Sequence, residues 1–236
     1  MDIKEVITIT IKNNLLNLEK NIHEALKRSG REGDKVQIIA VTKTVGVDKI
    51  NEAIELGLTN IGENRTQELV KKFDIIGNKA KYHMIGHLQT NKVKTIFDKI
   101  TLVHSLDRPS LAKELNKRAK KNGIIIDTLI QVNIAEEESK FGLKIDEVIP
   151  FIEKIINYEN LNVKGLMTIA PYVEDAEEAR WVFRELRRLS EVIKEKDYTN
   201  VKMDILSMGM TNDYEVAIEE GSNMIRIGTG LFGQRK

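Results

Sequence analysis

Eight short apolar runs alternate with amphipathic helical patterns along this chain, and this alternation is the feature that most constrains its fold. Runs this short and rich in Val and Ile indicate strands buried on both faces, as in a parallel sheet. Eight strand–helix units in 236 residues favour a closed (β/α)8 barrel, an α/β fold, over an open sheet. The predicted strands cover residues 36–42, 60–64, 81–87, 102–105, 124–133, 161–167, 203–207 and 224–228.

An additional helix is predicted before the first strand, over residues 5–29, and could cover the amino-terminal end of the sheet. Further helices are predicted over residues 91–100 and 175–196, and Thr211 is predicted to cap a short helix after the seventh strand. No linker or change of composition divides the chain. We therefore expect residues 1–236 to form a single TIM-barrel domain with an extra amino-terminal helix.

The composition is that of a globular protein, with 41% hydrophobic and 31% charged residues and a formal net charge of +1. No basic block marks a nucleic-acid-binding surface. The chain has no cysteine, which excludes thiolate metal sites and fits a reducing compartment. The first residues carry two acids, unlike a signal peptide, and no apolar stretch is long enough to cross a bilayer. We expect a cytoplasmic monomer that binds no nucleic acid, membrane or metal.

Polar or small residues follow most of the predicted strands. In a barrel the carboxyl ends of all strands meet on one face, where barrel enzymes place their active sites. Loops are generally polar, which explains any one of these residues but explains the whole set less well. The residues at these ends are Lys43, Glu63, Asn64, Gly86, His87, His104, Ser105, Asn133, Met167, Ser207, Met208, Gly228 and Thr229.

Two of the strand ends are suited to bind a phosphate. The Gly-Thr-Gly segment at 228–230 lets backbone N–H groups approach an anion closely, and the threonine hydroxyl can donate as well. Residues 207–211 lead from the seventh strand into a helix whose amino terminus favours anions. Phosphate sites of barrels often lie between the loops after strands seven and eight, so both segments stand where such a site is expected.

Lys43 ends the first strand, which lies beside the eighth when a barrel closes. A lysine is more often a solvated loop cation, but here it would lie in the barrel mouth beside Arg226 and the phosphate-binding segments. Partial burial and the nearby Arg226 would raise the fraction of neutral amine, the form that condenses with an aldehyde. A phosphate site beside such a lysine fits pyridoxal 5′-phosphate (PLP) and equally fits a phosphosugar aldolase.

Several motifs together resemble one family, the pyridoxal phosphate homeostasis proteins. They are AVTKT (40–44), IGENR (61–65), HMIGHLQTNK (83–92), GLM (165–167), LSMGMTND (206–213) and IRIGT (225–229). The similarity spans nearly the whole chain, and the barrel is similar to the amino-terminal domain of alanine racemase. The resemblance implies a fold-type III PLP-binding barrel without a second domain.

The resemblance also implies roles for individual residues, all of them in cofactor binding and none in catalysis. It implies that Lys43 forms an imine (Schiff base) with PLP, that Arg226 faces the pyridine nitrogen, and that Lys140 takes part in cofactor handling. Three positions depart from the family pattern: Gly46 replaces a proline, Thr211 a serine and Gly230 a small aliphatic residue. The implied phosphate ligands are Ser207, Thr211, Gly228 and Thr229, and the implied pocket residues are Asn64, His87 and Met167.

Two functions are open at this point. The first is a non-catalytic carrier that stores PLP or delivers it to PLP-dependent apoenzymes. An arginine against the pyridine nitrogen weakens the ring as an electron sink, and no second domain is expected to supply an opposing acid or base. The second is an enzyme, an amino-acid racemase or an imine-forming aldolase, with His87 or His104 as candidate acid–base groups. A purely structural barrel would have no use for the phosphate-binding segments.

Overall fold

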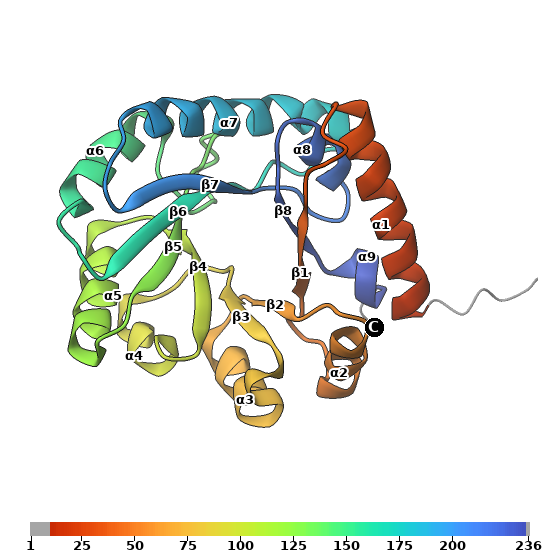
Figure 1. Cartoon of the computed structure of the whole chain (residues 1–236), viewed down its shortest axis with the longest axis horizontal. Helices are drawn as coiled ribbons and strands as arrows, with labels where there is room; N and C mark the ends of the chain where they lie inside the picture. Colours follow the sequence, from red (N-terminus) through yellow and green to blue (C-terminus); the bar gives the residue numbers. More distant parts are fainter. Residues whose placement is uncertain (1–9, 235–236) are drawn as a thin grey trace, which may run out of the picture.

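A computed structural model describes residues 10–234 of the protein. Within that range, eight parallel strands form a closed barrel in sequence order, so the predicted (β/α)8 fold is confirmed (Figure 1). The strands are β1 Gln37–Val41, β2 Asn60–Glu63, β3 Lys81–Met84, β4 Ile100–Leu106, β5 Ile126–Gln131, β6 Leu161–Met167, β7 Val201–Ser207 and β8 Met224–Ile227. The helices are α1 Ile11–Arg28, α2 Val47–Glu55, α3 Thr66–Ile76, α4 Val93–Ile96, α5 Pro109–Asn122, α6 Ile145–Ile155, α7 Arg180–Glu195, α8 Tyr214–Glu219 and α9 Thr229–Phe232.

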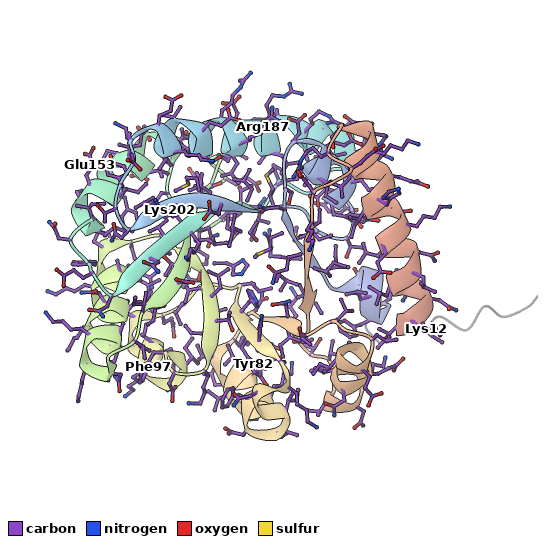
Figure 2. All side chains as sticks on the ribbon, viewed as in Figure 1. Lys12, Tyr82, Phe97, Glu153, Arg187 and Lys202 are labelled. Atoms are coloured by element: carbon purple, nitrogen blue, oxygen red, sulfur yellow. The ribbon has the colours of Figure 1, made fainter. Side chains whose placement is uncertain are left out.

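The barrel closes between β1 and β8, where Ile39 pairs with Arg226. Side chains alternate along each strand, so one set fills the barrel and the other packs under the outer helices. The inward set forms an apolar cluster, and side chains fill the space inside the barrel (Figure 2). The buried members of this interior cluster are Ile39, Val41, Ile85, Leu102, Leu129, Met167 and Met224.

The helix before the first strand does not cover the amino-terminal end of the sheet. Helix α1 packs along the side of the barrel, against α8 and α9, next to the β1–β8 closure. The reason is the shortness of α8 (6 residues) and α9 (4 residues), which leaves the outer faces of β1 and β8 for α1 to cover. The part of this helix predicted over residues 5–9 lies outside the described residues.

Two other elements differ from the prediction. Residues 91–100 do not form one helix: a 3-10 turn (Thr90–Lys92) leads into the short α4, and Ile100 already pairs with β3 as the first residue of β4. The helix predicted over 175–196 consists of a 3-10 turn (Ala176–Ala179) followed by α7. After β8, the sequence prediction missed α9, which begins within the Gly-Thr-Gly segment.

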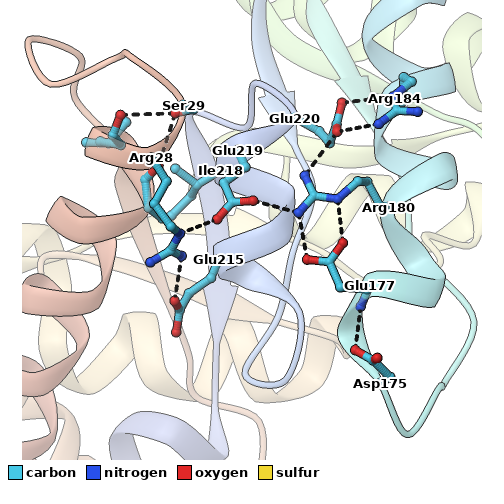
Figure 3. Close-up of polar contacts among 12 residues, drawn as sticks. Arg28, Ser29, Asp175, Glu177, Arg180, Arg184, Glu215, Ile218, Glu219 and Glu220 are labelled. Carbon is cyan, nitrogen blue, oxygen red and sulfur yellow. Dashed lines mark hydrogen bonds and ion pairs between the residues drawn. The ribbon is translucent and has the colours of Figure 1, made fainter.

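An ion-pair network on the outer surface ties α1, α8 and α7 together (Figure 3). Arg28 of α1 binds Glu219 of α8 at 2.5 Å, and Glu219 also accepts from Arg180 of α7 at 2.6 Å. Arg180 and Arg184 both bind Glu220. Burial alone would raise the pKa of Glu219, but the hydrogen bonds from Arg180 and Arg28 outweigh it and lower that pKa. The network fixes α8, the helix that follows the loop after β7.

Candidate functional site

A cavity of about 470 Å³ opens at the carboxyl ends of β1, β6, β7 and β8. Its volume lies in the range of small-molecule sites, and its position is where barrels bind their ligands. Both lysines of the predicted site reach it, one from the loop after β1 and one from the loop after β5. The polar and small residues that line it are Lys43, Lys140, Ala170, Thr211, Asn212, Asp213, Arg226, Gly228 and Thr229.

Lys43 reaches this cavity because of its place in the alternation of β1. Ile39 and Val41 face the barrel interior, so Lys43 lies on the same side, whereas Thr42 faces outward. Lys43 is half-buried. It shares the cavity with Arg226 of the neighbouring β8.

The backbone is held on both sides of Lys43. Lys72 Nζ donates to the Thr42 carbonyl at 2.6 Å, and the Thr44 N–H donates to a Glu68 carboxylate oxygen at 3.0 Å. Thr44 has a φ of 63°, a left-handed conformation that a β-branched residue rarely adopts. These contacts fix where the Lys43 side chain leaves the backbone.

A buried ion pair lies behind this segment, between β2 and α3. Lys72 Nζ binds Glu63 Oε1 at 2.6 Å, and the Thr42 hydroxyl donates to the same oxygen. The exposed fractions of the two charged side chains are 8% for Lys72 and 0% for Glu63. Burial raises the pKa of Glu63, while the hydrogen bonds from Lys72 and Thr42 oppose that rise.

Arg226 is held by three hydrogen bonds inside the barrel. Its Nη1 donates to the Ser207 carbonyl and to the Ser207 hydroxyl, each at 2.7 Å, and its Nη2 donates to the Thr168 carbonyl at 2.7 Å. Burial lowers the pKa of Arg226 to about 10, and the nearby Asp213 carboxylate acts against that shift. The guanidinium is therefore a cation at neutral pH, fixed at the wall of the cavity.

Thr211, Gly228 and Thr229 also line the cavity. Thr211 does not cap a helix, because α8 starts at Tyr214 with Asp213 in the cap position. The Thr211 hydroxyl instead accepts from the Gly230 N–H at 3.2 Å and lies 3.3 Å from the Thr229 hydroxyl. Two hydroxyls and the first turn of α9 thus face one space, which suits a phosphate group.

Four predicted site residues do not line this cavity. Ser207 is fully buried and its hydroxyl is bound to Arg226 and His104, so the predicted role as a phosphate ligand does not fit its position. Met167 lies in the apolar cluster inside the barrel. Asn64 and His87 line a separate cavity of about 590 Å³ on the β2–β3 side, where the His87 ring stacks on Phe141 at 3.9 Å.

Asp213 is a site residue that the sequence analysis missed. It lines the cavity, and Oδ1 accepts from the Met210 N–H at 2.6 Å. Burial raises the pKa of this carboxyl group, whereas the Met210 hydrogen bond and then the Arg226 charge lower it. Its place in the LSMGMTND motif, two residues after Thr211, was the available signal.

Lys140 extends over the rim of the same cavity from the loop between β5 and α6. Its ammonium donates to the Ala170 carbonyl at 3.0 Å and binds Glu137 at 2.5 Å. Lys140 thus differs from Lys43, because its side-chain nitrogen is already bound by protein oxygens.

Comparison with known proteins agrees with this geometry. The family model for the N-terminal domain of alanine racemase matches residues 14–236. The pyridoxal phosphate homeostasis protein of Aquifex aeolicus is 45% identical over 218 residues, which cover 92% of this chain and 95% of that protein. Within residues 10–234, no helix is both long and apolar enough to span a membrane.

Solved structures give the same picture. A protein of unknown function from Bifidobacterium adolescentis has a TM-score of 0.89 at 33% identity, with 94% of each chain covered. PipY of Synechococcus elongatus with PLP bound has a TM-score of 0.82 at 27% identity, covering 95% of this chain and all (100%) of PipY. The chain belongs to the alanine racemase N-terminal domain family and, within it, to the pyridoxal phosphate homeostasis proteins.

Proposed function

We propose that this protein binds PLP in the cavity at the barrel mouth and takes part in PLP homeostasis as a carrier of the cofactor. The observation that carries the proposal is that Lys43, Arg226 and the loops with Thr211 and Thr229 line one cavity. The name of its Aquifex aeolicus relative and the PLP-bound structure of PipY support it.

The residues of the cavity fit the chemistry of PLP. Thr211, Gly228 and Thr229 would hold the phosphate, and Arg226 would face the pyridine nitrogen. The aldehyde of PLP condenses with a neutral lysine amine, forming a C=N bond and releasing its oxygen as water. Lys43 would supply that amine, because among residues 10–234 no carboxylate or carbonyl binds its nitrogen, whereas Glu137 and the Ala170 carbonyl bind that of Lys140.

Arg226 fits a carrier that does no carbanion chemistry on the cofactor. Its guanidinium is a cation with only N–H donors, so it disfavours a protonated pyridine nitrogen beside it. A pyridine ring that stays neutral is a weak electron sink for carbanion chemistry. We assign no catalytic residue.

We further propose that residues 1–236 act as one barrel domain, as a cytoplasmic monomer that delivers PLP to PLP-dependent apoenzymes. The cysteine-free composition supports a reducing compartment. Sedimentation of the purified protein tests the proposed oligomeric state, and we expect the mass of one chain. Mixing the PLP-loaded protein with an apoenzyme tests delivery, and the proposal expects activity to appear without free PLP in solution.

Borohydride trapping tests the binding proposal. The protein is incubated with PLP, reduced, and digested for mass spectrometry, alongside Lys43→Ala and a Lys12→Ala control on the exposed face of α1. We expect one major adduct, on Lys43, in the wild type and in Lys12→Ala, and its loss in Lys43→Ala. Equal labelling of many surface lysines in all three proteins would refute the proposal. Racemisation of an added amino acid that depends on Lys43 would instead identify an enzyme.

A further inference from the structure

A chain of polar side chains crosses the interior of the barrel beside its apolar cluster and ends at Arg226. His83 Nε2 lies 3.2 Å from Asn60 Oδ1, and His83 Nδ1 lies 3.0 Å from His104 Nε2. His104 Nδ1 lies 3.1 Å from the Ser207 hydroxyl, which in turn accepts from Arg226. The five residues come from β2, β3, β4, β7 and β8, so the chain spans the barrel.

With both imidazoles neutral, the Asn60 end of this polar chain fixes the direction of every hydrogen bond in it, and the Arg226 end is compatible with that direction. Arg226 can only donate, so the Ser207 oxygen accepts from it and the Ser207 proton is free to donate to His104 Nδ1. At the other end, the Asn60 carbonyl oxygen can only accept, so His83 donates through Nε2. The middle bond then runs from His104 Nε2–H to His83 Nδ1. In this arrangement each neutral imidazole carries its proton on Nε2.

Burial and charge favour the neutral form of both rings. Burial, together with the Lys81 ammonium, lowers the pKa of His83 to about 4. Burial, and then the neighbouring His83 and Arg226, hold the pKa of His104 well below its usual range. Arg226 is therefore the one fixed positive charge among the five residues of the polar chain, and a second charge beside it is disfavoured.

The barrel fold itself does not require this polar chain. Barrel interiors are filled by branched apolar side chains, as the neighbouring Leu102 and Leu129 illustrate here. Polar groups in such an interior are costly unless each finds a partner. In this polar chain every side chain has a hydrogen-bond partner, and the chain ends at Arg226 in the cavity wall. This arrangement indicates that the chain serves Arg226.

We propose that His104 and His83 are positioning residues for Arg226, and this inference rests on the proposed PLP site. The three hydrogen bonds of Arg226 use three of its five N–H groups, which leaves two for a ligand in the cavity. By accepting the Ser207 proton, His104 turns a lone pair of that hydroxyl toward Arg226. His83 fixes the His104 tautomer that makes this possible. The guanidinium is thus held in one orientation toward the ring nitrogen before the cofactor arrives.

Three variants distinguish a role of His104 in positioning Arg226 from a role in packing the barrel interior. His104→Leu keeps the volume but removes the acceptor for Ser207, and His104→Asn restores an acceptor at the place of Nδ1. Leu102→Ala, in the same strand and also facing inward, is the matched control that damages the interior without touching the polar chain. For each variant, PLP affinity is measured by spectral titration and folding by thermal unfolding.

We expect His104→Leu to weaken PLP binding about tenfold and His104→Asn to recover most of that loss. Leu102→Ala should lower the unfolding temperature and leave the PLP affinity within about twofold of the wild type. Wild-type affinity in a folded His104→Leu protein would refute the positioning role, as would equal losses in His104→Leu and Leu102→Ala.

Nitrogen-15 NMR of the PLP-free protein provides a readout that is independent of the cofactor. We expect both His83 and His104 in the Nε2–H tautomer at neutral pH and one sharp Nε–H resonance for Arg226, broadened in His104→Leu. An Nδ1–H tautomer or a charged ring at either position would refute the hydrogen-bond direction. If the wild type binds no PLP while these signals are found, the proposed function fails and the polar chain stands.

Discussion

Two buried polar clusters lie beneath the cavity, one on the Lys43 side and one on the Arg226 side. The first is an ion pair, Lys72 with Glu63, outside the strands and under α3. The second is the neutral chain of His83, His104 and Ser207 inside the barrel. The ion pair acts on the Thr42 backbone, whereas the polar chain acts on the Arg226 side chain itself.

This difference matches the tasks proposed for the two residues. The contacts on the Lys43 side fix its backbone, and the side chain keeps its freedom to form and break a bond with a bound aldehyde. Arg226, in contrast, is held through both of its terminal nitrogens, which sets the orientation of its remaining N–H donors. A carrier that must release its cofactor needs a rigid recognition group and a mobile attachment group. The predictions below perturb one side at a time, from the largest expected effect to the smallest.

Breaking the ion pair between Lys72 and Glu63, on the Lys43 side, should cause the largest loss of stability. Lys72→Met leaves the Glu63 carboxylate buried without its cation, and we expect a loss of about 3–5 kcal/mol in the free energy of unfolding. Urea unfolding followed by circular dichroism measures it. The double variant Lys72→Met with Glu63→Leu should recover most of the loss.

The matched control is a surface pair of the same charge type. Arg188 and Glu185 lie 2.6 Å apart, with exposed fractions of 63% and 37%. Arg188→Met should cost less than about 1 kcal/mol, because exposed pairs contribute little. Similar losses in Lys72→Met and Arg188→Met would show that the buried pair does not support the Lys43 segment.

Lowering the pH should destabilise the folded protein through His83, in the polar chain on the Arg226 side. The pKa of His83 is about 4 in the folded protein and about 6.5 when unfolded, so below pH 6.5 the unfolded state binds more protons. Stability is then lost as the pH falls, by about 2 kcal/mol between pH 7 and pH 5 for this one histidine.

The comparison with His83→Phe isolates that contribution. The variant lacks the titrating ring, so its free energy of unfolding should change by about 2 kcal/mol less than that of the wild type over the same pH interval. The same pH dependence in both proteins would mean that His83 is not held neutral by the barrel.

The barrel and the location of the cavity were predictable from the sequence, because strand–helix alternation fixes both the fold and the face where strand ends meet. Lys43 and Arg226 were found for the same reason: β1 and β8 must be neighbours in a closed barrel. The side of the barrel covered by α1 was not predictable, since it depends on how short α8 and α9 turn out to be.

Individual polar contacts were predicted less well, because their partners are distant in sequence. Thr211 has the local features of a helix cap, but the Gly230 N–H competes for its hydroxyl. Ser207 follows an apolar run like a ligand residue, yet Arg226 and His104 occupy its hydroxyl. Local preference describes what a side chain can do, and strand register decides which partner it meets.

Crowding the phosphate-binding wall should weaken PLP binding with little effect on folding. A Cβ at Gly230 would lie 3.1 Å from the side chains of Ile227 and Thr211. The family pattern places a small aliphatic residue here beside a serine, whereas in this chain the added Cβ would meet the Thr211 methyl group, which a serine lacks. Gly230→Ala should therefore displace Thr211 and lower PLP affinity about tenfold, or about 1.4 kcal/mol. Gly46→Ala is the control, since no atom lies within 4 Å of its added Cβ. Unchanged affinity in Gly230→Ala would argue against Thr211 as a phosphate ligand.

The smallest change in stability is expected from restricting the backbone at Gly46, in the loop that follows Lys43. Gly46 has a φ of −70° and ψ of 154° at the start of α2, a conformation that proline adopts without strain. Gly46→Pro should stabilise the fold by about 0.4–1 kcal/mol, because the unfolded chain loses freedom. If mobility next to Lys43 serves release, the variant should also transfer PLP to an apoenzyme more slowly at an unchanged PLP affinity. If Gly46→Pro stabilises the protein and leaves the rate of PLP transfer unchanged, freedom of the loop after Lys43 is not needed for release. Release would then depend on the Lys43 side chain alone.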